Sequence, residues 1–485
     1  MEMFEPDGDG GFRQNVGVKI FGGWGSRGYP QKSMAIFARQ EYGRGKIQHQ
    51  LFPDKEVDSF ESFVLRNSGN DNQSTWLTYP RTEIKAFTPP VSYGSYFVNC
   101  NFTLFRDAMV QSLARETGLD TQGYRPAVLY LNGDYWGIYN IREKLTEHYV
   151  ESNHGVPSDE VDLIEGYGSA NSGSATAYNR MRSYVSSNDM NDPEHYQVVG
   201  EEHLDIGNFI DYHLVILWGR NFDIGNIKCW RPQTDNGTFR WLVYNQDYAF
   251  NLWKPEVYIP AMRRNFADYE DMFEFHTNSS GGGTGWPNAG GRTLLFREML
   301  ESDVFRERLI LRSADLFNHL WSTDRVIERI DEMAAVIRSE IPSHLERWSW
   351  AAIQERGFGF PHKEEDEPLN LEHWERNVEV MRAFARDRPA QFREQLMDHF
   401  GFENGTAEVG ITIQNADKGQ VVVNTLTVPS DSWSGIYYQD LPITIRAVPN
   451  EGATFTGWSG AVTGDAAEMT VTLNAVAVSI EAAFE

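Results

Sequence analysis

Residues 218–250 read WGRNFDIGNIKCWRPQTDNGTFRWLVYNQDYAF and combine the end of a helix with two short strands. The strands CWRP (229–232) and FRWLVYNQDYAF (239–250) flank Thr234–Gly237, a turn-forming sequence that is typical of a β-hairpin. Asp223 precedes this hairpin, and Asp247 lies on its second strand, 24 residues later. Because a hairpin reverses the chain, we expect it to bring the two carboxylates to one place.

The side chains around this hairpin match those that phosphoryl transfer requires. One Asp accepts or orients the hydroxyl proton, while an Asn and a second Asp hold the Mg²⁺ that neutralises charge on the phosphates. Asp223, Asn226 and Asp247 supply this set. The alternative is that they form turns and caps, as Asp and Asn commonly do.

A second motif, Gly23-Trp24-Gly25-Ser26-Arg27-Gly28, has the form GxGxxG. In a dinucleotide-binding fold a helix follows this motif directly, but here Tyr29-Pro30 and the strand Ser33–Arg39 follow, so that fold is excluded. A Gly-rich turn between two strands suits a kinase-like cover over phosphates, which Lys32 would then pair with. The alternative is an ordinary glycine hairpin.

Two further charged residues are candidates for the same site. Glu143 follows the strand YWGIYNIRE and is placed to pair with Lys32 or to help hold a metal. Arg106 lies on the predicted helix Phe102–Thr117 and is placed to reach a phosphate. The alternatives are a surface charge beside a strand end for Glu143 and a surface ion pair for Arg106.

Composition limits the function classes. The chain has 485 residues with 43 Lys and Arg against 69 Asp and Glu, a net charge of −26, which disfavours general nucleic-acid binding and binding to anionic lipid. Two cysteines, Cys100 and Cys229, exclude a disulfide scaffold and a Cys-rich zinc module. No apolar run approaches the roughly 20 residues that cross a bilayer. The acidic start is not a signal peptide, and because it resembles the middle of a domain, we expect an upstream portion.

The chain divides into regions of different pattern. Short alternating strands dominate residues 11–166, whereas residues 205–401 are mostly helical, with amphipathic stretches at 205–220, 294–321, 323–350 and 371–400. Residues 403–485 contain two basic and ten acidic residues and only strand-like patterns. We therefore predict one domain over residues 1–402 and a small β domain over residues 403–485.

The order of these motifs resembles that of the spore-coat CotH kinase family over about residues 11–401. No single motif is specific, but their ordered combination is. The matching stretches are GVKIFGGWGSRGYPQKSMAIF (17–37), the helix at 104–119, VLYLNGDYWGIYNIREKL (128–145), WGRNFDIGNIKCWRP (218–232), WLVYNQDYAF (241–250), LLFREMLESDVFRERL (294–309) and FARDRPAQFREQL (384–396).

The resemblance implies an α+β, atypical protein-kinase-like fold with a β-rich N-lobe and a helical C-lobe that binds ATP and Mg²⁺, with Mn²⁺ as a second candidate metal. Carried over by motif, Asp223 is the catalytic residue, and Asp247 and Asn226 are the metal ligands. The resemblance also implies a nucleotide site, formed by Gly23, Gly25, Ser26, Arg27, Lys32, Arg106 and Glu143.

Two departures from the family pattern bear on activity. Asn226 follows Asp223 by three residues, where the family places an Asn about five residues after the Asp. The family's WDxD becomes Gln246-Asp247-Tyr248-Ala249, so the second Asp is missing. These changes would alter the metal stoichiometry or mark a weak or dead kinase.

The C-terminal region resembles a divergent internalin-type B repeat. The resemblance rests on Pro449-Asn450-Glu451-Gly452, on Phe455-Thr456-Gly457-Trp458-Ser459-Gly460 and on the strand ending Glu481-Ala482-Ala483-Phe484. It implies a small β-grasp-like module with Trp458 in its core. Because such repeats occur on bacterial secreted and surface proteins, it also implies an extracytoplasmic location.

Together these features predict a secreted or surface protein kinase that transfers the γ-phosphoryl of ATP to Ser or Thr of an extracytoplasmic protein. The first alternative is a pseudokinase that acts as a surface scaffold. The second is a carbohydrate-binding surface protein, motivated by 14 tryptophans and the Gly-rich tract 279–291.

Overall fold

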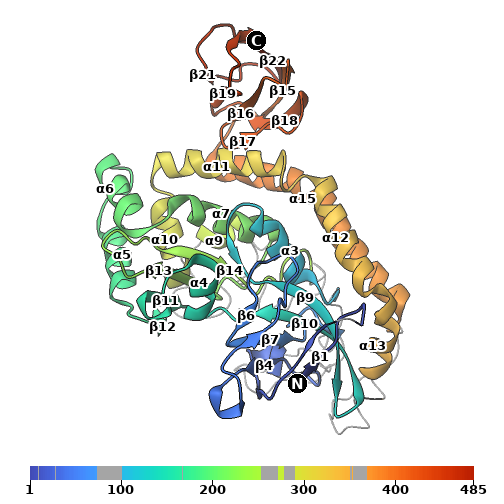
Figure 1. Cartoon of the computed structure of the whole chain (residues 1–485). Helices are drawn as coiled ribbons and strands as arrows, with labels where there is room; N and C mark the ends of the chain where they lie inside the picture. The colour runs from blue at the N-terminus through green and yellow to red at the C-terminus, as the bar shows by residue number, and fades with distance from the viewer. Residues whose placement is uncertain are drawn as a thin grey trace, which may run out of the picture.

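The computed structural model describes residues 1–485 except 9, 28, 74–100, 167, 253–270, 278–289, 350–351 and 353–368. Helices and strands are mixed through most of the chain, and its C-terminal part contains strands only. The N-terminal sheet and the C-terminal sheets lie toward opposite ends of the molecule, with helices between them (Figure 1). Within the described ranges, no helix combines the length and the apolar character needed to span a membrane.

An antiparallel five-stranded sheet forms the N-terminal part, in the order β3-β4-β7-β10-β9. Alternating apolar residues of its strands, such as Ile36, Phe63, Leu65 and Ile141, fill a core on one face. The short helix α1 (Trp24–Arg27) connects the first two strands. The strands are β3 (Gly17–Ile20), β4 (Met34–Phe37), β7 (Ser62–Arg66), β9 (Tyr124–Leu131) and β10 (Asp134–Glu143), and two-stranded pairs are formed by β1 (Glu2–Met3) with β2 (Phe12–Arg13) and by β5 (Ile47–Gln48) with β6 (Ser59–Phe60).

A second five-stranded sheet contains the predicted hairpin. Strands β13 (Lys228–Pro232) and β14 (Arg240–Val243) pair antiparallel, and the Gly237 N–H donates to the Thr234 carbonyl at 3.1 Å in the turn, so the hairpin itself is confirmed. The second strand is shorter than predicted, because it ends at Val243, and Asp247 lies in a turn after it. Cys229 on β13 is fully buried, and Cys100 lies outside the described residues. The sheet order is β12-β11-β13-β14-β8, with β8 (Asp120–Thr121), β11 (Val161–Glu165) and β12 (Ser169–Ser172).

Helices pack around this second sheet. Helix α7 (Ile206–Gly219) is apolar on nearly all sides and is buried accordingly, and it is capped by Arg220 with φ +56°, three residues before Asp223. The four helical stretches predicted at 205–220, 294–321, 323–350 and 371–400 are confirmed, although short breaks divide the second and the third. The helix predicted at 102–117 is also present, but it begins only at Arg106. The other α-helices described are α3 (Arg106–Arg115), α4 (Glu147–His154), α5 (Thr176–Ser187), α6 (Pro193–Val198), α9 (Met272–Thr277), α10 (Gly290–Met299), α11 (Asp303–Phe317), α12 (Thr323–Ile337), α13 (Ile341–Arg347) and α15 (Leu371–Phe400).

The C-terminal part, residues 406–484, is all β, as predicted, with Trp458 buried in its core. It has two four-stranded sheets and no helix, whereas the sequence predicted a β-grasp-like module. It contacts α11 (Figure 1). The sheet orders are β18-β15-β22-β20 and β17-β16-β19-β21, from β15 (Thr406–Gln414), β16 (Gly419–Val423), β17 (Leu426–Thr427), β18 (Ser432–Tyr438), β19 (Ile443–Pro449), β20 (Phe455–Gly460), β21 (Glu468–Val471) and β22 (Ala477–Phe484).

Candidate active site

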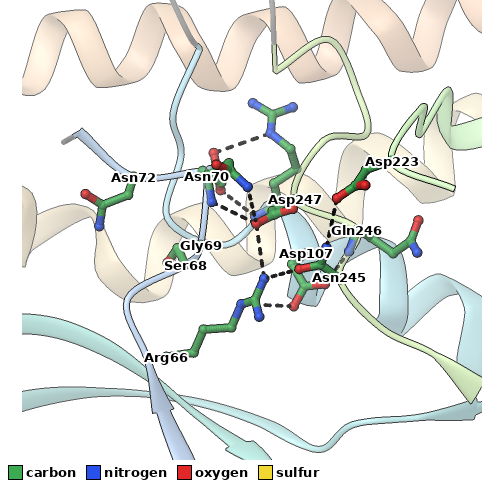
Figure 2. Close-up of polar contacts among 12 residues, drawn as sticks. Arg66, Ser68, Gly69, Asn70, Asn72, Asp107, Asp223, Asn245, Gln246 and Asp247 are labelled. Atoms are coloured by element: carbon green, nitrogen blue, oxygen red, sulfur yellow. Dashed lines mark hydrogen bonds and ion pairs between the residues drawn. The ribbon is translucent and has the colours of Figure 1, made fainter. Parts of the chain in front are cut away.

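Four segments that are distant in the sequence meet around Asp247 (Figure 2). The loop after β7 supplies residues 66–72, and the first turn of α3 supplies Asp107. The turn after α7 supplies residues 221–226, and the chain leaving β14 supplies residues 245–247. The sheet that contains β7 and the sheet that contains β14 therefore both contribute to this cluster.

Asp247 lies at the centre of this cluster and is almost fully buried, with 1% of its surface exposed. Its Oδ2 accepts hydrogen bonds from the Asn70 N–H at 2.7 Å and from Arg66 Nη2 at 3.1 Å. Its Oδ1 is buried and accepts no hydrogen bond from any described residue. Burial raises the pKa of Asp247 to about 7. The nearby carboxylates of Asp107 and Asp223 raise this pKa further, and the opposing effects of Arg66 and the Asn70 N–H are smaller than these combined effects.

Arg66, the last residue of β7, connects both predicted carboxylates. Its Nη2 donates to Asn245 Oδ1 at 2.7 Å as well as to Asp247. Asn245 in turn donates through Nδ2 to Asp223 Oδ2 at 3.3 Å (Figure 2). The structure thus brings Asp223 and Asp247 into one hydrogen-bonded cluster through Asn245 and Arg66.

Asp107 fixes the backbone beside Asp247. Its Oδ1 accepts from the Gln246 N–H at 2.6 Å, and its Oδ2 lies 3.3 Å from Arg142 Nη2 and 3.9 Å from Arg66 Nε. Burial opposes its charge, yet Arg142, Arg66 and the Gln246 N–H outweigh burial and lower the pKa of Asp107. Asp107 is therefore the charged partner that balances the two arginines, while Asp247 has the raised pKa.

Asp223 and Asn226 face each other within the turn after α7. Asn226 Nδ2 donates to Asp223 Oδ2 at 2.6 Å, and the Asp223 N–H donates to Asn221 Oδ1 at 3.1 Å. Both Asp223 and Asn226 are half-buried. The spacing of three residues therefore still places the Asn beside the Asp.

Gly69 allows the loop after β7 to approach Asp247 closely. Its φ is +64°, and a Cβ at this position would lie 2.0 Å from Asp247 Oδ2 and 2.6 Å from Arg66 Nη2. A side chain here would push the loop away from both charged groups. Glycine at this position is thus required for the contact between the Asn70 N–H and the carboxylate.

The Gly-rich motif forms a compact connection between β3 and β4. Gly23, Gly25, Ser26 and Arg27 belong to α1 or adjoin it, and the Ser33 N–H donates to the Ser26 carbonyl at 2.9 Å. Ser26 is buried and Arg27 is exposed. Lys32 donates to the Arg27 carbonyl at 2.7 Å, so its ammonium group lies over this connection.

The structure corrects the expected surroundings of Glu143 and Arg106. Glu143, at the end of β10, is buried and pairs with Lys55, not with Lys32. The Glu143 carboxylate also accepts a hydrogen bond from the Gly123 N–H at 2.6 Å. Arg106 has no exposed surface and binds Asp71 at 3.3 Å together with the carbonyls of Asn101, Ala249 and Phe250. With its guanidinium group engaged in this way, Arg106 joins the start of α3 to the chain after β14, so its role in this structure is structural.

Sequence reasoning missed Arg66, Gly69, Asn70, Asp107 and Asn245. The run Asn67-Ser68-Gly69-Asn70-Asp71-Asn72 directly after a strand was the available signal, because such residues form loops that present backbone donors. Asp107 gave no signal, since its role depends on contacts with residues 35 or more positions away along the chain.

The tryptophans do not form an exposed face. Among the nine whose side chains the structure describes, seven are buried and Trp136 and Trp433 are half-buried. The Gly-rich tract 279–291 lies mostly outside the described residues. No tryptophan with a described side chain is therefore exposed, so the tryptophan content does not support sugar binding in that part of the chain.

Comparison with known proteins gives two family matches. The model of the CotH kinase protein family matches residues 101–392, and the model of the divergent InlB B-repeat domain matches residues 410–485. No curated protein matches the chain. Among solved structures, the chain is similar to the Helicobacter pylori proinflammatory kinase CtkA, with 10% identity, a TM-score of 0.32, and coverage of 79% of this chain and 97% of that chain.

Proposed function

The chain belongs to the CotH kinase family, and from this premise we propose that it is an atypical protein kinase that transfers the γ-phosphoryl of ATP to a Ser or Thr hydroxyl. In this proposal the sheet β3-β4-β7-β10-β9 is the N-lobe, and the second sheet with its helices is the C-lobe. The cluster around Asp247 then lies where the two lobes meet. The single observation that carries the proposal is the buried Oδ1 of Asp247, which lies in one cluster with Asp223 and has no hydrogen-bond donor among the described residues.

The residues present fit a divalent metal. A buried carboxylate oxygen without a hydrogen-bond donor is costly unless a cation or a proton occupies it, and hard cations such as Mg²⁺ prefer oxygen ligands. Asp247 and Asn226 would hold the metal, as the family motif implies. The bound metal would neutralise negative charge on the phosphates.

Asp223 would act on the substrate hydroxyl. Asn226 and Asn245 donate to its Oδ2, which fixes the plane of the carboxylate. As the hydroxyl oxygen forms its bond to the γ-phosphorus, the bond from that phosphorus to the ADP oxygen breaks, and the hydroxyl proton passes to Asp223. Arg27, Lys32 and the amides of the Gly-rich connection would contact the nucleotide phosphates.

We also propose that residues 1–402 and 403–485 are separate domains and that the protein acts outside the cytoplasm. The match of residues 410–485 to the divergent InlB B-repeat model supports this location, because such repeats are found on secreted and surface proteins. The phosphorylated protein would then be a secreted or surface protein.

A second candidate function, a pseudokinase scaffold, is favoured by two observations. Arg66 already neutralises Asp247 from the Oδ2 side at 3.1 Å and would repel a metal. Ala249, which replaces the second Asp of the family motif, is fully buried in the core, and its carbonyl binds Arg106. Residue 249 therefore points into the core and does not supply a second metal ligand.

The deciding experiment measures ATP binding with and without Mg²⁺ or Mn²⁺, followed by transfer of radiolabelled γ-phosphate to the protein itself. The kinase proposal expects metal-dependent ATP binding and labelling of wild type, and no labelling of Asp223→Asn. Asp324→Asn, on the first turn of α12 and outside the cluster, is the matched control and should label normally. Metal-dependent ATP binding without labelling would favour the pseudokinase.

A further inference from the structure

Strand β3 lies at an edge of the N-terminal sheet and is open for pairing. The Phe21 N–H donates to the Ser33 carbonyl at 2.9 Å, and β3 continues antiparallel to β4 with Lys19 opposite Ala35. Because antiparallel residues alternate, the backbone groups of Val18 and Ile20 point away from β4, toward the free edge. No strand among the described residues pairs with this edge.

The two faces of β3 differ in chemistry. Val18 and Ile20 lie on the face of the apolar core of the sheet, yet they are 59% and 52% exposed. On the opposite face, Lys19 and Phe21 adjoin Phe37 and Lys144, whose ammonium group lies 4.8 Å from the Phe37 ring centre and 5.9 Å from that of Phe21. A strand added here would meet apolar side chains on one face and cations on the other.

This edge is positively charged within an acidic protein. Residues 11–46 contain seven Lys and Arg and one acidic residue, Glu41, a net charge of +6 in a chain of −26, although Arg13, Arg39 and Lys46 pair with Glu2, Glu41 and Glu61. Among described residues, neither Lys19 nor Lys144 forms an ion pair. Burial lowers the pKa of Lys144, and although Glu147 opposes this, the nearby Lys228, Lys19 and Arg39 lower it further. The cations are thus crowded and incompletely neutralised.

The opposite edge of the same sheet provides an internal comparison. Strand β9 also exposes apolar side chains, Val128 at 40% and Tyr130 at 60%. It contains Pro126, however, which lacks a backbone donor and is a common means of preventing edge pairing. Strand β3 has no proline, so within the described residues its edge keeps all of its outward backbone donors, whereas the β9 edge lacks the one at Pro126.

We propose that β3 is a docking edge for an extended acidic segment of a protein partner, which adds to the sheet as a sixth strand. In this segment acidic residues alternate with apolar ones, so that acids face Lys19 and Lys144 while apolar side chains cover Val18 and Ile20. Charge complementarity favours an acidic partner, and the outward backbone groups favour a polypeptide, because only a strand matches their spacing. The net charge of −26 disfavours long polyanions such as nucleic acid.

The test is fluorescence anisotropy with a labelled heptapeptide Asp-Val-Glu-Ile-Asp-Val-Glu, measured on the full chain without ATP or metal. Its outcome is thus independent of the proposed kinase activity. We expect saturable binding that weakens with salt, and binding about tenfold weaker for a peptide of the same composition in which the acids are grouped together. Equal binding of both peptides, or no binding of either, would overturn the proposal.

Two variants locate the site on β3. Lys19→Glu should weaken binding of the heptapeptide at least about tenfold, whereas Lys418→Glu, an exposed cation of the C-terminal part, should leave it unchanged. Val18→Pro removes an outward N–H without breaking the ladder to β4 and should also weaken binding, with an unchanged thermal midpoint as the check on folding. If Lys418→Glu weakens binding as much as Lys19→Glu, or if single-stranded DNA or anionic vesicles bind more tightly than the peptide, the proposal is wrong.

Discussion

Two buried aspartates, Asp247 in the candidate active site and Asp315 on α11, have similar burial but different surroundings. Asp315 is 2% exposed and accepts hydrogen bonds at both oxygens, Oδ1 from Tyr437 at 2.9 Å and Asn424 at 3.3 Å, and Oδ2 from the Thr425 N–H at 2.8 Å. These donors all belong to the C-terminal β part. Among the described residues, Asp247 has donors on Oδ2 alone.

Burial raises the pKa of both groups, to about 7 for Asp247 and about 6 for Asp315. A raised pKa therefore does not by itself distinguish the two carboxylates. Their hydrogen bonding does, because the fully satisfied Asp315 holds two parts of the chain together, whereas one oxygen of Asp247 has no donor among the described residues and is the atom that the proposed metal would bind.

The largest expected effect is on catalysis at Asp247. If the protein is an active kinase, Asp247→Asn should reduce γ-phosphate transfer by at least about a thousandfold, or about 4 kcal/mol of transition-state stabilisation, because the amide lacks the charge that holds the metal. Radiolabel incorporation with Mg²⁺ and with Mn²⁺ measures this. The kinase proposal would be falsified if the variant labelled as well as wild type.

The same substitution should stabilise the fold at high pH. The folded pKa of Asp247, about 7, lies above the ordinary value of 3.8, so the folded state binds a proton between these values and its stability falls as pH rises through 7. Asn does not ionise, so in EDTA the variant should gain about 3 kcal/mol over wild type between pH 5 and pH 8, nearly all of it below pH 7. Urea melts at both pH values test this, and a difference independent of pH would contradict it.

Removing Asp315 should weaken the attachment of the C-terminal part. Asp315→Ala leaves the Tyr437 hydroxyl and the Thr425 N–H without their acceptor and should cost about 2–3 kcal/mol in urea unfolding, with ATP binding unchanged. Asp417→Ala, an exposed acid of the C-terminal part, should change stability by less than about 0.5 kcal/mol. Loss of ATP binding in Asp315→Ala would show that the two regions are coupled.

The smallest effect comes from a pair of glycines with positive φ. Gly452→Ala, with φ +82° and open space around it, should cost only the backbone strain of about 1 kcal/mol. Gly69→Ala adds the clash with Asp247 and should cost more, about 2 kcal/mol, and also weaken metal-dependent ATP binding. Thermal melts and ATP titrations of both variants measure the difference, and equal costs would show that the loop after β7 can move away from Asp247.

Several elements were predictable from local pattern. The hairpin of β13 and β14, the long helices of the second half and the all-β C-terminal part follow from periodicity and turn residues, which act over a few neighbouring positions, although the second strand ends earlier than predicted. The family resemblance also placed Asp223, Asn226 and Asp247 in one site, and the structure brings them into one cluster. Their catalytic and metal-binding roles remain predictions.

The partners of the charged residues were decided by tertiary structure alone. The sequence determined where many strands, helices and turns form and which carboxylates flank the hairpin, because these depend on side-chain order and backbone preference. It did not determine that Glu143 pairs with Lys55, that Arg106 is fully buried, or that Arg66 reaches Asp247 from 181 residues away. Those outcomes depend on how the sheet containing β7 packs beside the one containing β14, since an ion pair forms only where packing brings two charges together and excludes water.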